Sequence, residues 1–141
     1  MIPKYRGLSI DEKSKGEWQY GYLIEDNGQA FIINEVIEAN EQYITIGSWC
    51  PVDPKTVGQS TGLRDKNGKE IFEKDILDYN GRKVIVNWHG SYAGFIYRFV
   101  DGLHKRNAEW NPLYLAYYHF EVVGNKFENP ELLEVEWWNF Y

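Results

Sequence analysis

The chain has 141 residues, of which 43% are hydrophobic and 17% aromatic, a composition that excludes a disordered chain and suits one domain with a hydrophobic core. Its net charge of −6 argues against a protein that binds nucleic-acid backbones through bulk charge. The single cysteine, Cys50, excludes an internal disulfide and a thiolate metal cluster. The sequence has no hydrophobic export signal and no apolar run of the roughly 18 residues that a membrane span requires, so we expect a cytoplasmic protein.

Alternating apolar residues predict a first half built from strands. Residues 17–25 read as a strand that gathers four large side chains on one face: Trp18, Tyr20, Tyr22 and Ile24. Asn27-Gly28 supplies the positive-φ pair that a tight hairpin turn needs, so residues 29–33 should return as the partner strand. Alternation over residues 43–46 predicts a third strand, which should end at Pro51 because proline cannot donate to a β-ladder.

Two further turn signals predict hairpins in the middle of the chain. Asp65–Gly68 should turn the chain into a strand over residues 69–73. Asn80-Gly81 is the strongest short hairpin signal in the sequence, and it should join strands over residues 76–79 and 82–88.

The rest of the chain is less regular. Strands are expected over residues 94–100 and 120–124, whereas residues 103–120 fit no single period and predict a loop followed by a strand. Asn129-Pro130 predicts a helical turn that Asn129 caps. The aromatic tail, residues 134–141, should pack on its own domain or on a neighbour, because its exposure to water would be costly.

Residues 58–62, Gly-Gln-Ser-Thr-Gly, match the GxSxG pattern of hydrolases. In those enzymes the serine sits between a strand and a helix, and acid and histidine partners follow in a large sheet. Here a proline-bounded loop precedes Ser60 and a turn signal follows it. The pattern therefore favours a turn and a bulge over a nucleophile.

An acidic group lies just beyond this stretch: Glu70, Glu73, Asp75 and Asp78. Glu73 and Asp75 would share a face of a strand, and paired carboxylates can hold a metal or act as acid and base. Lys69 and Lys74 interleave with them, which favours a solvated face or hydrogen bonds to turns. The three histidines, at 89, 104 and 119, show no metal-ligand spacing, and no phosphate-binding glycine loop occurs. We therefore predict no catalytic, metal or cofactor-binding residue.

Residues 82–108 carry five basic residues and one acidic residue, between two acidic flanks. The cations alternate with aromatic residues: Arg82, Lys83, Trp88, Tyr92, Phe95, Tyr97, Arg98, Phe99, Lys105 and Arg106. Such a mixture can bind single-stranded nucleic acid by stacking and charge. The favoured interpretation is that the aromatics fill a core and the cations pair with the acidic flanks, because the overall charge opposes phosphate binding.

The stretch Val52–Leu77 reads VDPKTVGQSTGLRDKNGKEIFEKDIL and closely resembles the signature of the YopX family of phage and prophage proteins, approximately VDPETVGQ-aromatic-TGLKDKNGKEIYEGDIV. The opening KYRG with WxYGxLI, and the closing EVVGN with ENPELL, resemble the family in the same order along the chain. Ser60, Lys74 and Lys126 depart from its pattern. Lys74 stands where the family has glycine, which argues against a positive-φ backbone at this position.

The resemblance implies a mainly β protein, with an SH3-like barrel formed by the part after the signature, acting in the bacterial host cytoplasm. It implies no activity. Within the signature, Gly62 and Gly68 would permit tight turns. Turn geometry would be held through backbone N–H groups by Asp65, Glu73 and Asp75. The motif residues expected to be structural are Gly58, Gln59, Thr61, Gly62, Leu63, Asp65, Gly68, Ile71, Glu73, Asp75 and Ile76.

We therefore expect a single all-β domain, whose two lobes would comprise residues 1–56 and 57–141. The favoured function is a non-enzymatic module that binds a protein partner and forms homo-oligomers through sheet edges or the tail. The candidate interaction surface comprises Arg82, Lys83, Trp88, Arg98, Trp137 and Trp138. The alternative is a nucleic-acid-binding β-barrel that uses residues 82–106, and an enzyme based on the acidic group comes third.

Overall fold

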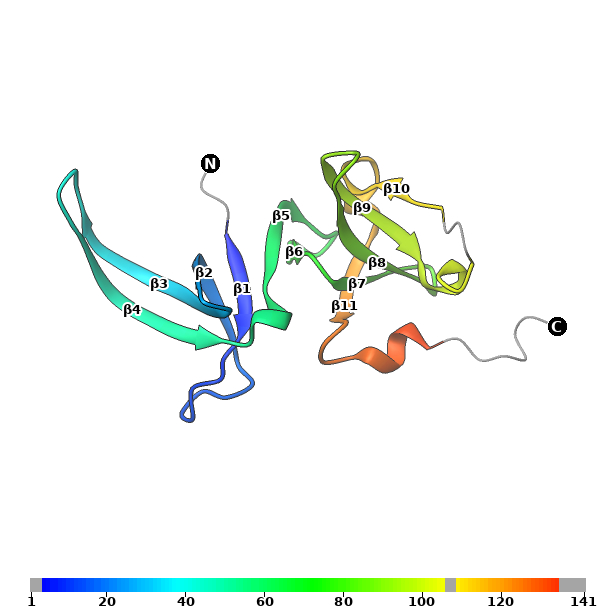
Figure 1. Cartoon of the computed structure of the whole chain (residues 1–141). Helices are drawn as coiled ribbons and strands as arrows, with labels where there is room; N and C mark the ends of the chain where they lie inside the picture. The colour runs from blue at the N-terminus through cyan, green and yellow to red at the C-terminus, as the bar shows by residue number, and fades with distance from the viewer. Residues whose placement is uncertain (1–3, 106–108, 135–141) are drawn as a thin grey trace. The chain divides into compact units, whose positions relative to one another are not determined.

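The structure is a computed structural model that describes residues 4–105 and 109–134. This part of the chain contains eleven strands, five short 3-10 helices and no α-helix (Figure 1). All strands pair antiparallel, in the orders β4-β3-β2-β1-β5-β6 and β10-β9-β8-β7-β11. The prediction of an all-β fold is confirmed. The chain divides into two compact units, residues 1–60 and 61–141, while the expected division at residue 56 stays a prediction.

Unit 1 is a meander of four strands, and the start of a fifth strand pairs with the first. Its strands are β1 (Tyr5–Leu8), β2 (Trp18–Asp26), β3 (Gln29–Ala39), β4 (Ile44–Val52) and the first residues of β5 (Gly58–Arg64). The predicted hairpin between β2 and β3 is confirmed, with Asn27 at φ 51° and Gly28 at φ 77°. The helix η1 (Pro54–Thr56) connects β4 to β5.

Strand β4 does not end at Pro51 as predicted. Pro51 pairs with Phe31 of β3, and its carbonyl accepts a hydrogen bond from the Ile10 N–H at 3.1 Å. The backbone polar groups of Pro51 therefore face the outer side of β4. Its missing N–H removes no bond to β3, which is why proline is tolerated on an edge strand.

One face of unit 1 is buried around Ala30, Ile32 and Val52, with Tyr5 and Leu23 packed against them. The glycines of the family opening explain how closely the strands approach. A Cβ at Gly21, whose φ is 153°, would lie 2.0 Å from the Ile33 carbonyl oxygen. Only glycine fits this position without backbone movement.

Unit 2 contains the last residues of β5, β6 (Glu70–Phe72), β7 (Asp75–Tyr79), β8 (Arg82–His89), β9 (Gly94–Phe99), β10 (Asn111–Pro112) and β11 (Glu121–Asn125). The hairpin at Asn80-Gly81 is confirmed, with φ values of 50° and 88°. The turn at residues 65–68 is confirmed by a hydrogen bond from the Asp65 N–H to the Lys69 carbonyl. The core contains Ile71, Leu77, Val84, Val86, Leu113 and Phe120.

Three sequence expectations in unit 2 need correction. Residues 113–119 form two 3-10 helices, η3 (Leu113–Leu115) and η4 (Tyr117–His119), in place of a strand. The helical turn η5 (Pro130–Leu133) is confirmed, but the Asn129 side chain does not cap it and instead accepts from the Asn125 N–H. The third correction concerns Lys74, which takes a φ of 72°.

The remaining 3-10 helix, η2 (Val100–Gly102), follows β9. Within residues 4–105 and 109–134, no helix has the length and apolar character needed to cross a membrane. The predicted packing of the aromatic tail falls on residues 135–141, outside the described part of the chain.

Candidate functional site

Asp65 of the family signature joins a turn to a distant strand. Its Oδ1 accepts hydrogen bonds from the N–H groups of Asn67 and Lys69, and its Oδ2 accepts from the Val122 N–H at 2.8 Å. Asp65 is 6% exposed. A buried carboxylate with three backbone donors is a structural group rather than one that awaits a substrate.

The other signature residues also contact backbone or core. Asp75 is 1% exposed and accepts from the Phe72 N–H, and Thr61 donates to the Ile71 carbonyl while accepting from the Leu63 N–H. Gly68, at φ 83°, lies in a turn as expected, whereas Gly62, at φ 76°, lies within β5, so the turn expected at residues 58–62 is not formed. Of the remaining members, Gly58 and Gln59 pair with β1. Ile71 and Ile76 are fully buried, and Glu73 is half-buried.

Ser60 lies within β5, which continues to Arg64, so the turn of a nucleophile elbow is not formed there. Its N–H donates to the Lys4 carbonyl. Glu73 sits in the turn before β7, and therefore does not share a strand with Asp75. In the described ranges, no three His, Cys, Asp or Glu side chains are grouped to hold a metal ion.

The basic aromatic segment uses two of its cations in ion pairs. Arg82 pairs with Asp101 at 3.2 Å and stacks over the Phe99 ring, while Lys83 lies 3.9 Å from Asp78. These acidic partners reduce the charge available for phosphate groups. Further along, Trp88 is 49% exposed, and its ring makes a T-shaped contact with the Phe95 ring. Arg98 is half-buried and Lys105 is exposed. Arg106, Trp137 and Trp138 lie outside the described residues.

Lys74 is held in its left-handed conformation by bonds on both sides of its backbone. Its N–H donates to the Val86 carbonyl, and its carbonyl accepts from the Lys126 N–H. The side-chain amine donates to Asn87 Oδ1. Burial lowers the pKa of Lys74, Glu73 opposes this effect, and the charges of Lys126 and Arg98 lower it further.

An aromatic pocket of about 400 Å³ opens in unit 2, and we refer to it as the tyrosine pocket. Its lining comes from β5, from the β8–β9 connection, from the start of β9 and from η3: Thr61, Leu63, Tyr92, Ala93, Gly94, Phe95 and Tyr114. None of these residues is charged. A hydrogen bond to Tyr114 raises the pKa of Tyr92, and desolvation acts in the same direction. No local signal in the sequence marks this site, because its residues come from three separate segments.

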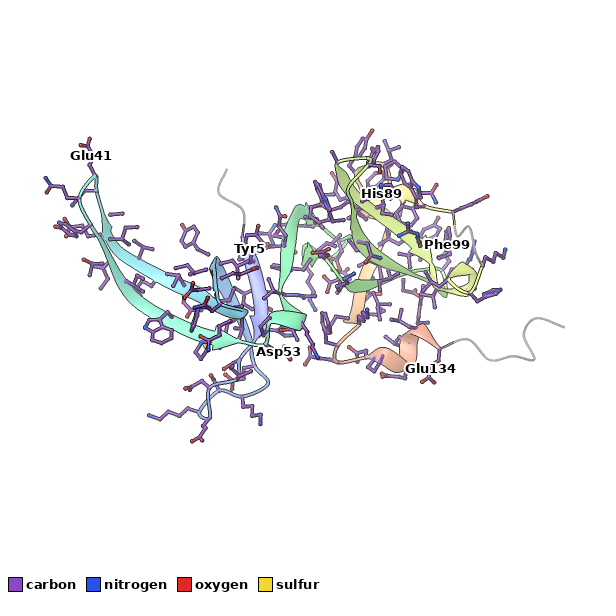
Figure 2. The ribbon with its side chains drawn as sticks, viewed as in Figure 1. Tyr5, Glu41, Asp53, His89, Phe99 and Glu134 are labelled. Atoms are coloured by element: carbon purple, nitrogen blue, oxygen red, sulfur yellow. The ribbon has the colours of Figure 1, made fainter. Side chains whose placement is uncertain are left out.

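The β8–β9 connection positions Tyr92 through several specific contacts. His89 Nδ1 accepts a hydrogen bond from the Tyr92 N–H. The Trp110 ring packs against the His89 ring, with 4.7 Å between their centroids, and against the Tyr92 ring, with 5.1 Å between theirs. Figure 2 shows His89 at this end of β8. Ala93 takes a φ of 59°, an unfavourable conformation for a residue with a Cβ.

Unit 1 also exposes large apolar side chains along β2, β3 and β4. The members of this set are each 38% or more exposed: Tyr20, Tyr22, Ile24, Val36, Ile37, Ile44, Ile46 and Trp49. The hairpin of β3 and β4 extends to a tip marked by Glu41, and side chains project from it along its length (Figure 2). Exposed apolar residues in this number make these strands a candidate interaction site.

Strand β4 also has an open edge. It stands at the end of its sheet, and its only other bridge in the described chain joins Val52 to Ser9. The backbone from Ile44 to Cys50 therefore offers unpaired N–H and C=O groups on its outer side. No residue of β4 is charged. The sequence predicted this strand but not its exposure, which depends on what packs beside it.

Comparisons with known proteins agree with the sequence resemblance. A family model described as YopX protein matches residues 4–134. The crystal structure of protein EF1440 from Enterococcus faecalis matches with a TM-score of 0.62 and 30% sequence identity, covering 95% of this chain and 99% of that chain. Among curated proteins, none matches this chain.

Proposed function

The chain belongs to the YopX family, and from this premise we propose that it is a non-enzymatic, phage- or prophage-encoded protein-interaction module of the host cytoplasm. We further propose that it associates with a second copy of itself through the open edge of β4. We also propose that unit 2, whose strands are ordered β10-β9-β8-β7-β11, folds as an SH3-like barrel.

The observation that carries the proposal is the combination of an uncharged open edge with an exposed apolar surface. Long, apolar edge strands are normally protected by charge, proline or a covering loop, because they pair readily with other chains. In β4 the loop at Ser9 and Ile10 covers only the end near Pro51. The backbone between Ile44 and Cys50 has no such protection.

A second copy is the occupant that the charges favour. In a two-fold antiparallel pairing, residue i of one copy faces residue j of the other and residue j faces residue i, so charges of one sign on β4 would be brought close together across the edge. Strand β4 has none, and the glutamates of this hairpin, Glu35, Glu38 and Glu41, lie on β3 and at the tip. Antiparallel pairing of two β4 strands therefore meets no like-charge contact between directly paired residues.

The hairpin also offers apolar surface beside the open edge. Six of its apolar or aromatic side chains are between 38% and 65% exposed: Val36, Ile37, Tyr43, Ile44, Ile46 and Trp49. Backbone and polar groups along the edge would add to this surface toward the roughly 800 Å² per partner that specific interfaces bury.

The test compares two lysine variants by sedimentation equilibrium. Replacing Ile44 and Ile46 together by lysine places charges on the open edge and should reduce the association constant by about a hundredfold or more, or convert the protein to a monomer. The control replaces Leu103 and Leu115 of unit 2 together by lysine, which adds the same two charges at residues of similar exposure outside β4 and should leave association unchanged. A wild-type monomer at all concentrations, or equal association of both variants, would refute the proposal.

A further inference from the structure

We propose that the tyrosine pocket binds a proline-rich segment of a partner protein in the polyproline II conformation. This site belongs to unit 2 alone and goes beyond the proposed self-association. It rests on the lining of the pocket, on the way in which the β8–β9 connection is built, and on the absence of charge among the lining residues.

The walls of the pocket favour an apolar, uncharged ligand. Three of the lining residues are aromatic, Tyr92, Phe95 and Tyr114, and Leu63 adds an aliphatic face. The Thr61 hydroxyl already donates to the Ile71 carbonyl, so it offers no free donor to an entering group. Pyrrolidine rings pack on aromatic faces of this kind and bring no charge that would need a partner.

The donors near the pocket match the backbone of a polyproline II helix. Such a helix makes no internal hydrogen bonds, so its carbonyl groups need external donors. Tyr92 and Tyr114 share one hydrogen bond between their hydroxyl groups, which leaves one of the two O–H groups as a donor to a ligand. Trp110, which packs against Tyr92 and is 36% exposed, adds an indole N–H. A volume of about 400 Å³ falls in the range of pockets that bind specific ligands.

The connection between β8 and β9 is arranged to present Tyr92. The Tyr92 N–H is bonded to His89 Nδ1, and Ala93 is held at φ 59° by hydrogen bonds to the carbonyls of His89 and Gly90. Left-handed backbone costs a residue other than glycine roughly 1–2 kcal/mol. Strain of this kind persists where the surroundings impose it, and it is concentrated at binding sites.

Two other ligand classes fit the lining less well. A methylated ammonium ion is also bound by aromatic rings, but no carboxylate lines this pocket to complement its charge. A base of single-stranded nucleic acid could stack on the tyrosines, but no lining residue is a cation that would bind the neighbouring phosphates.

The experiment is a titration of the isotopically labelled full chain, followed by backbone amide NMR signals. The probes are a ten-residue oligoproline peptide, a glycine-serine peptide of equal length, tetramethylammonium chloride and oligothymidylate. Oligoproline should shift the amide signals of residues 92–95 and 114 in a saturable manner. The glycine-serine peptide should not shift them.

Two matched variants locate the binding site. Tyr114→Ala removes a pocket wall and should weaken oligoproline binding by about tenfold or more. Tyr118→Ala removes a tyrosine of nearly equal exposure, 55% against 58%, which does not line the pocket, and binding should be retained. Unchanged signal dispersion in both variants would show that they fold.

Gly94→Ala gives an independent test that leaves every aromatic residue present. A Cβ at Gly94 would lie 3.0–3.1 Å from the Tyr92 ring, so the ring must shift and binding should weaken. The proposal is overturned if oligoproline fails to bind, if Tyr114→Ala and Tyr118→Ala bind it equally, or if only tetramethylammonium or oligothymidylate shifts these signals. None of these outcomes affects self-association through β4, which is measured separately.

Discussion

Lys74 allows a direct test of how tertiary contacts impose an unfavourable backbone conformation. Its φ of 72° lies in the left-handed region, and both of its backbone groups are hydrogen-bonded, to Val86 and to Lys126. Substitution by glycine removes the steric cost of the Cβ. Substitution by alanine keeps that cost while removing the same long side chain, so the pair of variants isolates the backbone effect.

The expected difference follows from two opposing terms. Relief of left-handed strain favours glycine by roughly 1–2 kcal/mol. The greater freedom of glycine in the unfolded chain opposes this by about 0.4–1 kcal/mol. Lys74→Gly should therefore be more stable than Lys74→Ala by about 1 kcal/mol in free energy of unfolding.

The assay is urea denaturation at neutral pH, followed by tryptophan fluorescence. With a slope of about 2 kcal/mol/M, a difference of 1 kcal/mol separates the two midpoints by roughly 0.5 M. Equal midpoints, or a higher midpoint for Lys74→Ala, would contradict the left-handed geometry at this position. A change of slope between the variants would instead indicate that the units unfold separately.

The lysine side chain adds a pH dependence of defined sign. Because burial lowers the pKa of Lys74 below its ordinary value of 10.5, the folded state disfavours the charged amine. The resulting stabilisation of the folded state is present above pH 10.5 and is lost as the pH falls through the lowered pKa. Relative to Lys74→Met, the wild-type protein should therefore gain stability as the pH rises through this window. A constant difference would contradict the shift.

Three further predictions concern other positions. Gly21→Ala should destabilise unit 1 by roughly 3 kcal/mol, because the added Cβ would lie 2.0 Å from the Ile33 carbonyl oxygen. Gly28→Ala, with no atom within 4 Å of its added Cβ, should cost about 1 kcal/mol, and thermal denaturation of both variants measures the difference. Asp65→Asn should lower the free energy of unfolding by about 2 kcal/mol in urea denaturation, because an amide cannot accept from all three backbone donors. Asp53→Asn keeps the one acceptor that its turn uses, so its free energy of unfolding should be unchanged. The hydrogen bond to Tyr114 raises the pKa of Tyr92, so the stabilisation that this bond gives the folded state is present below pH 10.0 and is lost as the pH rises through the raised pKa. Tyr114→Phe should therefore lower the Tyr92 pKa in an NMR titration of labelled tyrosine.

Turns were predicted well because their signals are local. Asn27-Gly28 and Asn80-Gly81 both adopt the positive φ values that the dipeptides favour, and Asp65 holds its turn through its own side chain. Lys74 was predicted wrongly for the converse reason. Its conformation is imposed by hydrogen bonds to β8 and to the residue after β11, which a reading of neighbouring residues cannot include.

The candidate surfaces illustrate a second limit of prediction from sequence. Alternation in β4 predicted a strand, but the same pattern occurs in strands with a covered edge and in strands with an open one. The tyrosine pocket combines residues that are as far apart as Thr61 and Tyr114. Their meeting depends on the order of the strands, and the irregular segment that contains η3 gave no periodic signal.

The family signature contributes to the fold and to the tyrosine pocket at the same time. Thr61 joins β5 to the Ile71 carbonyl and also lines the pocket, while Leu63 packs on the core and forms a wall. A substitution at either residue would therefore change stability and binding together, and loss of binding would not identify the site. Tyr114 lies outside the signature and is 58% exposed. Its substitution separates recognition from folding, which makes it the residue on which the proposed ligand is best tested.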